Sequence, residues 1–150
     1  MDVTITRLEP MYYASAYGYG DAPELEALRH LSDWAGPKGL LHSAETVLYG
    51  FNNPFPTETR PRYGYELWLG VPPGTEPEGN IRMGEFFGGT YAVTRCAGVQ
   101  NLPSNWVELA VWLESSDRTP TGMPGFERYV SPLDTPFEDF VFELCLPLRD

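Results

Sequence analysis

Residues 91–98 read Tyr-Ala-Val-Thr-Arg-Cys-Ala-Gly, and residues 13–18 read Tyr-Ala-Ser-Ala-Tyr-Gly. Both segments open on Tyr-Ala, continue with residues typical of a strand and reach a glycine. A proline-led helical stretch follows each of them, from Pro103 and from Pro23. The same order at a nearly constant spacing predicts a tandem duplication.

Each predicted copy closes on a matched strand, Tyr-Glu-Leu-Trp-Leu at 65–69 and Phe-Glu-Leu-Cys-Leu at 142–146. The sequence therefore predicts an α+β fold made from a tandem β-α-β-β repeat with pseudo-two-fold symmetry. We expect a mostly antiparallel sheet, two helices and a central cleft, within a single domain of residues 1–150. The repeat halves are expected at about 1–72 and 80–150.

The first half is expected to hold three strands and one helix. In order, these are a strand at 3–17 bent at Glu9-Pro10, a turn at 18–20, a helix capped by Asp21 with Pro23 in its first turn and ended by Gly36-Pro37, and strands at 46–51 and 62–71. An apolar stripe of Leu25, Leu28, Leu31 and Trp34 predicts the buried face of this helix. The acidic segment 72–79 is expected to link the halves.

The second half is expected to repeat this order. Its predicted elements are a strand at 81–96 interrupted at Gly88-Gly89, a helix at 103–114, a loop at 115–125, a short strand at 126–130, a turn at 133–136 and a closing strand at 138–148. The helix places Trp106, Leu109, Ala110 and Leu113 on one face.

The formal net charge is −11. Such a balance argues against direct nucleic-acid binding, which needs Lys and Arg to replace phosphate counterions, and against docking on an anionic membrane. It favours a cationic small molecule as partner. The N-terminal sequence has no signal-peptide pattern, so we expect a cytoplasmic protein.

Few residues offer metal-binding or nucleophilic chemistry. Cys96 and Cys145 lie in apolar, strand-like runs and are expected to be buried free thiols. The two histidines, His30 and His42, are too few for most histidine-ligated metals, and neither a zinc-protease motif nor a serine nucleophile elbow is present. We expect no metal and no cofactor.

Aromatic residues and one carboxylate remain. Glu127 stands in Phe-Glu-Arg-Tyr-Val at 126–130, where strand alternation places it on one face with Tyr129. If this face lines the cleft, a bound cation could pair with the carboxylate and contact the surrounding rings. The alternative is a surface glutamate paired with a nearby arginine. Trp106 could likewise belong to the core or to a cleft wall, and we interpret Glu66 and Glu143 as inherited sheet positions.

Four segments carry a resemblance to a known family. They are Gly-Thr-Tyr-Ala-Val at 89–93, Pro-Ser-Asn-Trp at 103–106, Phe-Glu-Arg-Tyr-Val-Ser-Pro at 126–132 and Phe-Val-Phe-Glu-Leu-Cys-Leu-Pro at 140–147. In this order and spacing the chain resembles the GyrI-like small-molecule-binding family, the effector-binding domain of AraC- and MerR-type multidrug-responsive regulators. The resemblance covers essentially the whole chain and is firmer in its second half.

The resemblance implies a cleft for amphipathic, often cationic, aromatic molecules. It places Glu127 at the family's cation-binding glutamate, with Trp106 from the second helix and Phe140 from the closing strand as pocket walls. We add Trp68, Tyr49 and Tyr129 as further wall residues. No DNA-binding helical region precedes residue 1, so the expectation is a stand-alone binding domain.

Two alternatives stay open. Some relatives hydrolyse reactive aromatic compounds with a tyrosine that follows a Gly-Pro turn, whereas this chain has Gly98-Val99-Gln100 there; Tyr19 after Gly18 could replace it. The sequence therefore favours a binding protein over an enzyme. The other alternative is a protein-interaction module, such as a topoisomerase modulator, with Glu76-Pro77-Glu78 as the contact.

Overall fold

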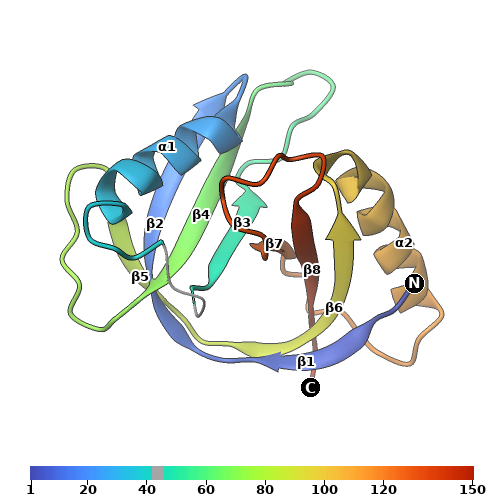
Figure 1. The fold of residues 1–150 in the computed structure, drawn as a ribbon. Coiled ribbons are helices and arrows are strands. Elements are labelled where there is room, and N and C mark those ends of the chain that lie inside the picture. The colour runs from blue at the N-terminus through green and yellow to red at the C-terminus, as the bar shows by residue number, and fades with distance from the viewer. Residues whose placement is uncertain (42–45) are drawn as a thin grey trace. The chain divides into compact units, whose positions relative to one another are not determined.

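The computed structural model describes residues 1–41 and 46–150, and it is α+β (Figure 1). The chain divides into two compact units: unit 1 holds residues 1–9 and 88–150, and unit 2 holds residues 10–87. Among the described residues, each unit contains one α-helix and four strands, and the strand pairings within each unit are antiparallel. His42 lies outside the described residues.

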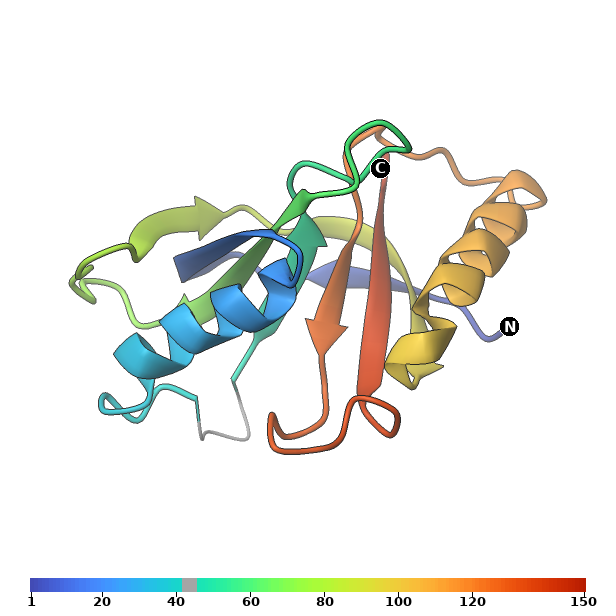
Figure 2. The same cartoon turned by 90° about the horizontal axis from the view of Figure 1, so that it is seen from above.

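Unit 2 is a four-stranded sheet with one helix on it. Its elements are β2 (Met11–Gly20), α1 (Pro23–Ala35), β3 (Leu48–Asn52), β4 (Tyr63–Val71) and β5 (Arg82–Phe86), and its strand order is β3-β4-β2-β5. Helix α1 lies along β2 and β4 (Figures 1 and 2). The helix approaches closely at Gly18, where a Cβ atom would overlap the backbone oxygen of Pro23. Ala14 and Ala16 share this face of β2 and are buried.

Unit 1 has a corresponding arrangement. Its elements are β1 (Thr4–Leu8), β6 (Gly89–Ala97), the 3₁₀ helix η1 (Val99–Asn101), α2 (Leu102–Glu114), β7 (Phe126–Tyr129) and β8 (Val141–Leu148), with strand order β1-β6-β8-β7. Each unit thus contains a strand, a helix and two strands in that order, as β2-α1-β3-β4 and as β6-α2-β7-β8. Each also has one additional edge strand, β5 in unit 2 and β1 in unit 1. The duplication, its two-fold symmetry, the single binding domain and the central cleft stay predictions.

The predicted strand at 3–17 is wrong. It is two strands, β1 and β2, which belong to different units and pair with different partners. The break falls at Glu9-Pro10, where proline supplies no N–H to a ladder. The predicted turn at 18–20 is also wrong, because these residues complete β2 and pair with Tyr63–Tyr65 of β4.

Residues 72–79, the predicted linker between the repeat halves, directly follow β4 and lie within unit 2, and the halves stay a prediction. This segment joins β4 to β5, and both strands pair with β2 in unit 2. The following strand at 81–96 is divided into β5 and β6 near the expected glycines, with Gly88 and Gly89 at positive φ. The chain therefore returns from unit 2 to unit 1 between Phe87 and Gly88.

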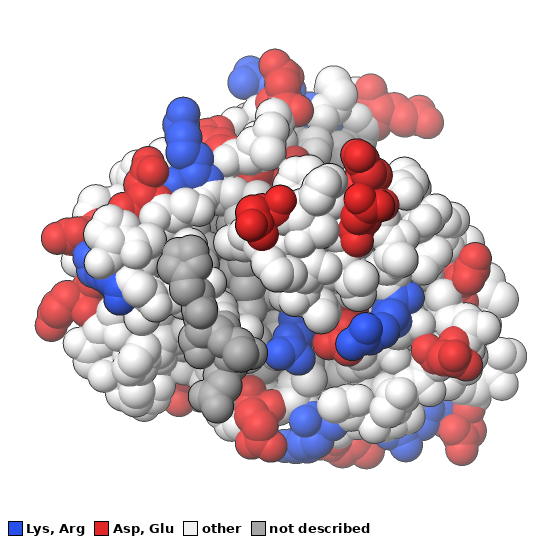
Figure 3. Space-filling model, in the orientation of Figure 1, with Lys and Arg blue, Asp and Glu red and all other residues white. Residues whose placement is uncertain are grey.

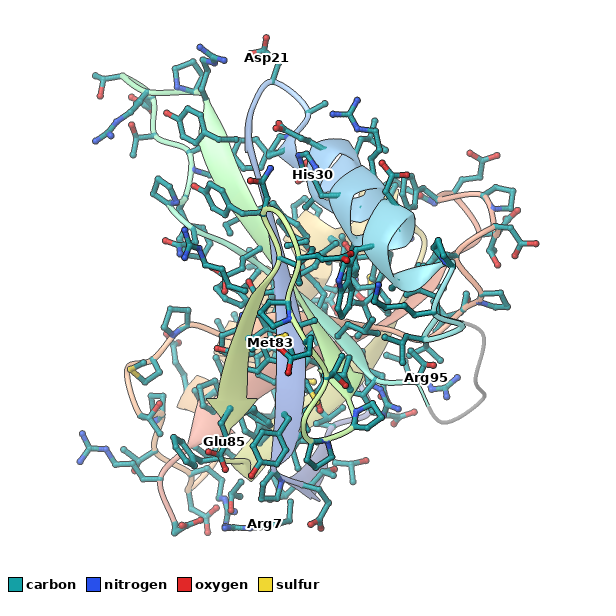
Figure 4. All side chains as sticks on the ribbon, turned by 90° about the vertical axis from the view of Figure 1, so that its left-hand side faces the viewer. Arg7, Asp21, His30, Met83, Glu85 and Arg95 are labelled. Atoms are coloured by element: carbon teal, nitrogen blue, oxygen red, sulfur yellow. The ribbon has the colours of Figure 1, made fainter. Side chains whose placement is uncertain are left out.

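Helix α1 begins at Pro23 as expected and ends before Gly36. Its N-cap is Ala22, not Asp21, and no side chain caps it. Asp21 instead directly follows β2 in the connection to α1, and its carboxylate lies 3.8 Å from Nε of Arg62 (Figure 4). Of the predicted apolar stripe, Leu31 and Trp34 are buried, whereas Leu25 is 58% exposed and Ala27 takes its place in the core.

Helix α2 has a small buried face. Among its described side chains only Leu109 is fully enclosed, whereas the predicted core residue Ala110 is exposed. Val107 and Val111 are 65% and 59% exposed, so the apolar character of this helix exceeds what its own unit buries.

None of the described helices has the length and hydropathy needed to span a membrane. Acidic and basic side chains are both scattered over the face seen in Figure 3, between broad uncharged areas. The excess of acidic residues, which gives a net charge of −11, is therefore not gathered into one block on this face.

Candidate functional site

Glu127 lies on the short strand β7, directly opposite Leu144 of β8. Its side chain is half-buried, and its Oε1 accepts a hydrogen bond from the indole Nε1 of Trp106 over 3.4 Å. Trp106 lies early in α2, which begins at Leu102 and has Pro103 in its first turn. The indole ring reaches β7 across Gly125, where a Cβ atom would lie 2.8 Å from the ring. Glycine at 125 thus provides the space that brings Trp106 to Glu127.

The charge of Glu127 affects the pKa of two buried thiols, those of Cys96 and Cys145. Burial raises the pKa of Cys96, and the Glu127 carboxylate raises it further. Burial also raises the pKa of Cys145, with Glu143 and Glu127 acting in the same direction and Arg128 against them. Both thiols are therefore held neutral, as expected for buried cysteines, and Glu127 projects a negative potential into the sheet.

Arg128, the next residue along β7, pairs with the carboxylate of Glu143. Nη1 of Arg128 lies 3.5 Å from Oε1 of Glu143, its cross-strand neighbour on β8. Alternation along β7 places Arg128 on the opposite face from Glu127.

Tyr129 and Phe140, two other predicted wall residues, contact each other in unit 1. Their rings meet edge to face with centroids 5.6 Å apart, and Phe142 adds a second such contact to Tyr129 at 5.2 Å. Phe140 is 0% exposed and Tyr129 is 8% exposed. Phe140 does not lie on the closing strand, where it was expected. The N–H of Phe140 donates to the backbone oxygen of Phe137 in a turn, and β8 begins at the next residue.

Tyr49 and Trp68, the remaining predicted wall residues, lie in unit 2. They are direct cross-strand partners on β3 and β4. Phe86 contacts both, with ring centroids 5.6 Å from Tyr49 and 6.2 Å from Trp68. The six predicted residues thus form three contacting groups: Glu127 with Trp106, Tyr129 with Phe140, and Tyr49 with Trp68.

The sequence interpretation missed the aromatic rings that surround Trp68. Tyr13 stacks on its indole at 4.1 Å with an interplanar angle of 9°, and Phe51 meets it edge-on at 5.0 Å. The indole Nε1 donates a hydrogen bond to Oε2 of Glu66. Alternation along β4 already indicates that Glu66 and Trp68 share a face, but the neighbours from β2 and β3 follow only from the register.

A separate cavity of about 470 Å³ lies in unit 1. It is lined by Met1, Asp2, Thr4, Thr6, Val93, Thr94, Arg95, Asn105, Glu108 and Glu143. These are polar and charged residues for the most part, and they differ from the six predicted ones.

The features tied to hydrolysis or metal binding are sparse. Gly98 has φ +88° and leads into η1, and Tyr19 is part of β2 with the guanidinium of Arg62 5.7 Å from its ring. His30 on α1 lies 3.6 Å from the Glu26 carboxylate, one helical turn away (Figure 4). Within residues 1–41 and 46–150, no group of three His, Cys, Asp or Glu side chains could hold a metal ion.

Comparison with solved structures shows the fold in other proteins. The chain is similar to the C-terminal domain of EcmrR, with a TM-score of 0.78 and 13% identity over 99% of this chain and 98% of that domain. Against EcmrR in a cryo-EM complex with DNA, the TM-score is 0.76 at 14% identity, over 99% of this chain and 57% of EcmrR. This chain therefore spans little more than half of that regulator.

A third structure is SAV2435 bound to tetraphenylphosphonium. The TM-score is 0.60 at 13% identity, over 99% of this chain and 94% of that protein. No curated protein sequence matches this chain. The model of the GyrI-like small molecule binding domain matches residues 1–149. The chain belongs to the GyrI-like family of small-molecule-binding domains.

Proposed function

We propose that the protein binds amphipathic cationic aromatic molecules, with the carboxylate of Glu127 as the anionic group and the indole of Trp106 as a ring beside it. The observation that carries this proposal is the 3.4 Å contact between Trp106 Nε1 and Glu127 Oε1 in a half-buried position. A carboxylate that is partly withdrawn from water gains free energy from a bound cation, and an adjacent ring adds cation–π attraction.

Two further observations support this ligand class. SAV2435, which shares the fold, binds tetraphenylphosphonium, a cation surrounded by aromatic rings. The net charge of −11 also favours encounter with cations. Tyr129 and Phe140, in the same unit as Glu127, are proposed as further wall residues, and Tyr49 with Trp68 as a group of ligand-binding residues in unit 2. An anionic group beside flat rings selects charge and aromaticity more than one molecular shape, so binding of several drugs is expected.

The test is a fluorescence titration with rhodamine 6G, followed by displacement with tetraphenylphosphonium or with neutral triphenylphosphine oxide. We expect saturable binding by the wild type and displacement by the cation more than by the neutral compound. Glu127→Gln should weaken rhodamine 6G binding at least about 10-fold, equivalent to about 1.4 kcal/mol. Triphenylphosphine oxide should bind both proteins about equally.

Glu143→Gln is the matched control, because it removes one negative charge from the adjacent strand where Arg128 already pairs it. Equal losses in the two variants would show a general charge effect and contradict the role of Glu127. Recovery of chemically altered ligand after incubation would favour the hydrolase instead. Absence of binding, together with co-purification of a topoisomerase, would favour the protein-interaction module.

A further inference from the structure

The 470 Å³ cavity of unit 1 lies where the edge strand β1 begins beside β6. The first residue of β1 is Thr4, which stands opposite Val93, so Thr94 and Arg95 of β6 extend past the start of β1. The chain before β1 stays close to them, because Thr94 donates from Oγ1 to the backbone oxygen of Asp2 over 2.7 Å. Side chains of α2 also line the cavity, which therefore joins three segments of unit 1.

Arg95 brings a positive charge to this cavity, and its side chain is exposed (Figure 4). Its cross-strand neighbour on β8 is Glu143, but that carboxylate forms its ion pair with Arg128 of β7 over 3.5 Å. Within residues 1–41 and 46–150, the guanidinium of Arg95 takes part in no ion pair or hydrogen bond. A guanidinium in this state can bind a ligand carboxylate through two parallel hydrogen bonds.

Three uncharged polar side chains line the same cavity. Thr4 and Thr6 lie on one face of β1, and this face also carries Arg95, because Thr4 stands opposite Val93 and Arg95 follows Val93 by two residues. Asn105 is half-buried in α2. In the part of the chain that the structure describes, the side chains of Thr4, Thr6 and Asn105 form no hydrogen bond. Their donors and acceptors are therefore available to a ligand.

Two carboxylates determine which charged ligands the cavity can accept. Asp2 and Glu108 line it together with Arg95, and both are exposed. Among the described residues, neither carboxylate forms an ion pair. They would repel a ligand that carries only negative charge, and Arg95 would repel one that carries only positive charge. A ligand that carries one charge of each sign would be attracted by both groups.

We propose that this cavity, here called the Arg95 site, binds the zwitterion of a small polar α-amino acid. The carboxylate of the ligand pairs with Arg95, and its ammonium group pairs with Glu108. Asn105 precedes Glu108 by one helical turn, so its amide lies on the same side of α2 and can bind the ligand as well. Thr4 and Thr6 supply hydroxyls for a polar side chain of the ligand. The volume of about 470 Å³ is within the range of roughly 300–1,000 Å³ that is usual for small-molecule sites.

The Arg95 site does not depend on the proposed function. Its lining includes none of the six residues proposed for the aromatic cation, and the ligand needs no ring contact. Failure of one proposal therefore leaves the other untouched, and Glu127→Gln separates them.

The test is a titration with L-glutamine, followed through the backbone amide resonances of Arg95 and Glu108 by NMR. We expect both resonances to shift with a saturable dependence on ligand concentration. N-acetyl-L-glutamine has no ammonium group, and L-glutaminamide has no carboxylate. Each should bind at least about 10-fold more weakly than L-glutamine, because each loses one of the two charge pairs.

Arg95→Gln and Glu108→Gln should each weaken L-glutamine binding at least about 10-fold. Both substitutions change exposed side chains, so the fold should be retained. Arg7→Gln is the matched control, because Arg7 is an exposed arginine of β1 that already pairs with Asp150 (Figure 4). It should bind L-glutamine as the wild type does, and so should Glu127→Gln.

The loss in Glu108→Gln should be specific to ligands with an ammonium group, so N-acetyl-L-glutamine should bind this variant and the wild type about equally. Shifts without saturation would mean that the cavity holds only water. That result, equal binding of the three ligands, or unchanged affinity in Arg95→Gln would overturn the proposal. Loss of L-glutamine binding in Glu127→Gln would place the ligand elsewhere and would overturn it as well.

Discussion

Trp106 and Glu127, one from the start of α2 and one from β7, are joined by a 3.4 Å hydrogen bond from the indole Nε1 to the carboxylate Oε1. A cation could interact with both partners of this contact, the carboxylate of Glu127 and the ring of Trp106. The two contributions can be separated by substitution.

Trp106→Phe should keep an aromatic face and lose the N–H donor, whereas Trp106→Ala loses both. We expect Trp106→Phe to weaken rhodamine 6G a few-fold and Trp106→Ala at least about 10-fold, in fluorescence titrations. Trp112→Phe, on the same helix, is the control and should bind as the wild type does. If Trp106→Ala binds equally well, the indole is only part of the protein core.

Cys96 and Cys145 are each 1% exposed, and burial raises the pKa of both thiols. Because the thiolate is the reactive form, native protein at pH 8 should react with iodoacetamide far more slowly than unfolded protein. Mass spectrometry with and without urea measures both rates. Rapid labelling of Cys145 under native conditions would contradict its burial.

Tyr63 donates a 2.6 Å hydrogen bond to Oε1 of Glu24, which joins β4 to the first turn of α1. Burial is the largest cause that raises the pKa of Tyr63, and the hydrogen bond to Glu24 and the charge of Glu24 raise it further, to about 12. Its neutral form stabilises the folded state below the unfolded pKa near 10, and this contribution is lost as the pH rises toward 12.

A spectrophotometric titration of tyrosine should therefore show one component near pH 12 that Tyr63→Phe removes. The substitution should also lower the free energy of unfolding at pH 7 by about 1 kcal/mol, through loss of the hydrogen bond. A titration curve that Tyr63→Phe leaves unchanged would contradict the assignment.

Gly64→Ala should destabilise unit 2, because the new methyl would overlap both the Tyr17 phenol and the backbone oxygen of Asn53. We expect a loss of about 1–3 kcal/mol in urea unfolding, as for an overpacked site. Gly70→Ala is the control on the same strand, since its nearest neighbour is the flexible Met11 side chain, with Sδ 3.1 Å away. Equal stabilities of the two variants would show that the Tyr17 ring moves aside without cost.

Local patterns were sufficient to predict both helices, β4 and β7 close to their observed bounds. They failed at Gly18 and Gly20, because glycines typical of turns also serve in a strand that a helix approaches closely. Pro10 predicted a bend. The pairing of β1 with β6 joins segments that lie far apart in the sequence, so no local pattern predicts it.

The candidate site divides in the same way. Glu127 and Trp106 were both predicted from the family pattern, and their contact additionally depends on the space at Gly125. Glu66 was interpreted, with Glu143, as an inherited sheet position, because the two glutamates occupy matching places in the predicted repeats. The residues that flank Glu66, Tyr17 and Phe51, are revealed by the register of three strands, which the sequence does not state.

The division of unit 1 into residues 1–9 and 88–150 affects how the chain assembles. Unit 2 is continuous, so a ribosome delivers all four of its strands before it makes any partner for β1. Until β6 emerges, β1 is an unpaired edge of the kind that chaperones or neighbouring chains can capture. A chain that ended at residue 87 would thus contain all of unit 2 and an unmatched strand before it, and the pairing of Thr4 with Val93 must wait for the later part of the chain.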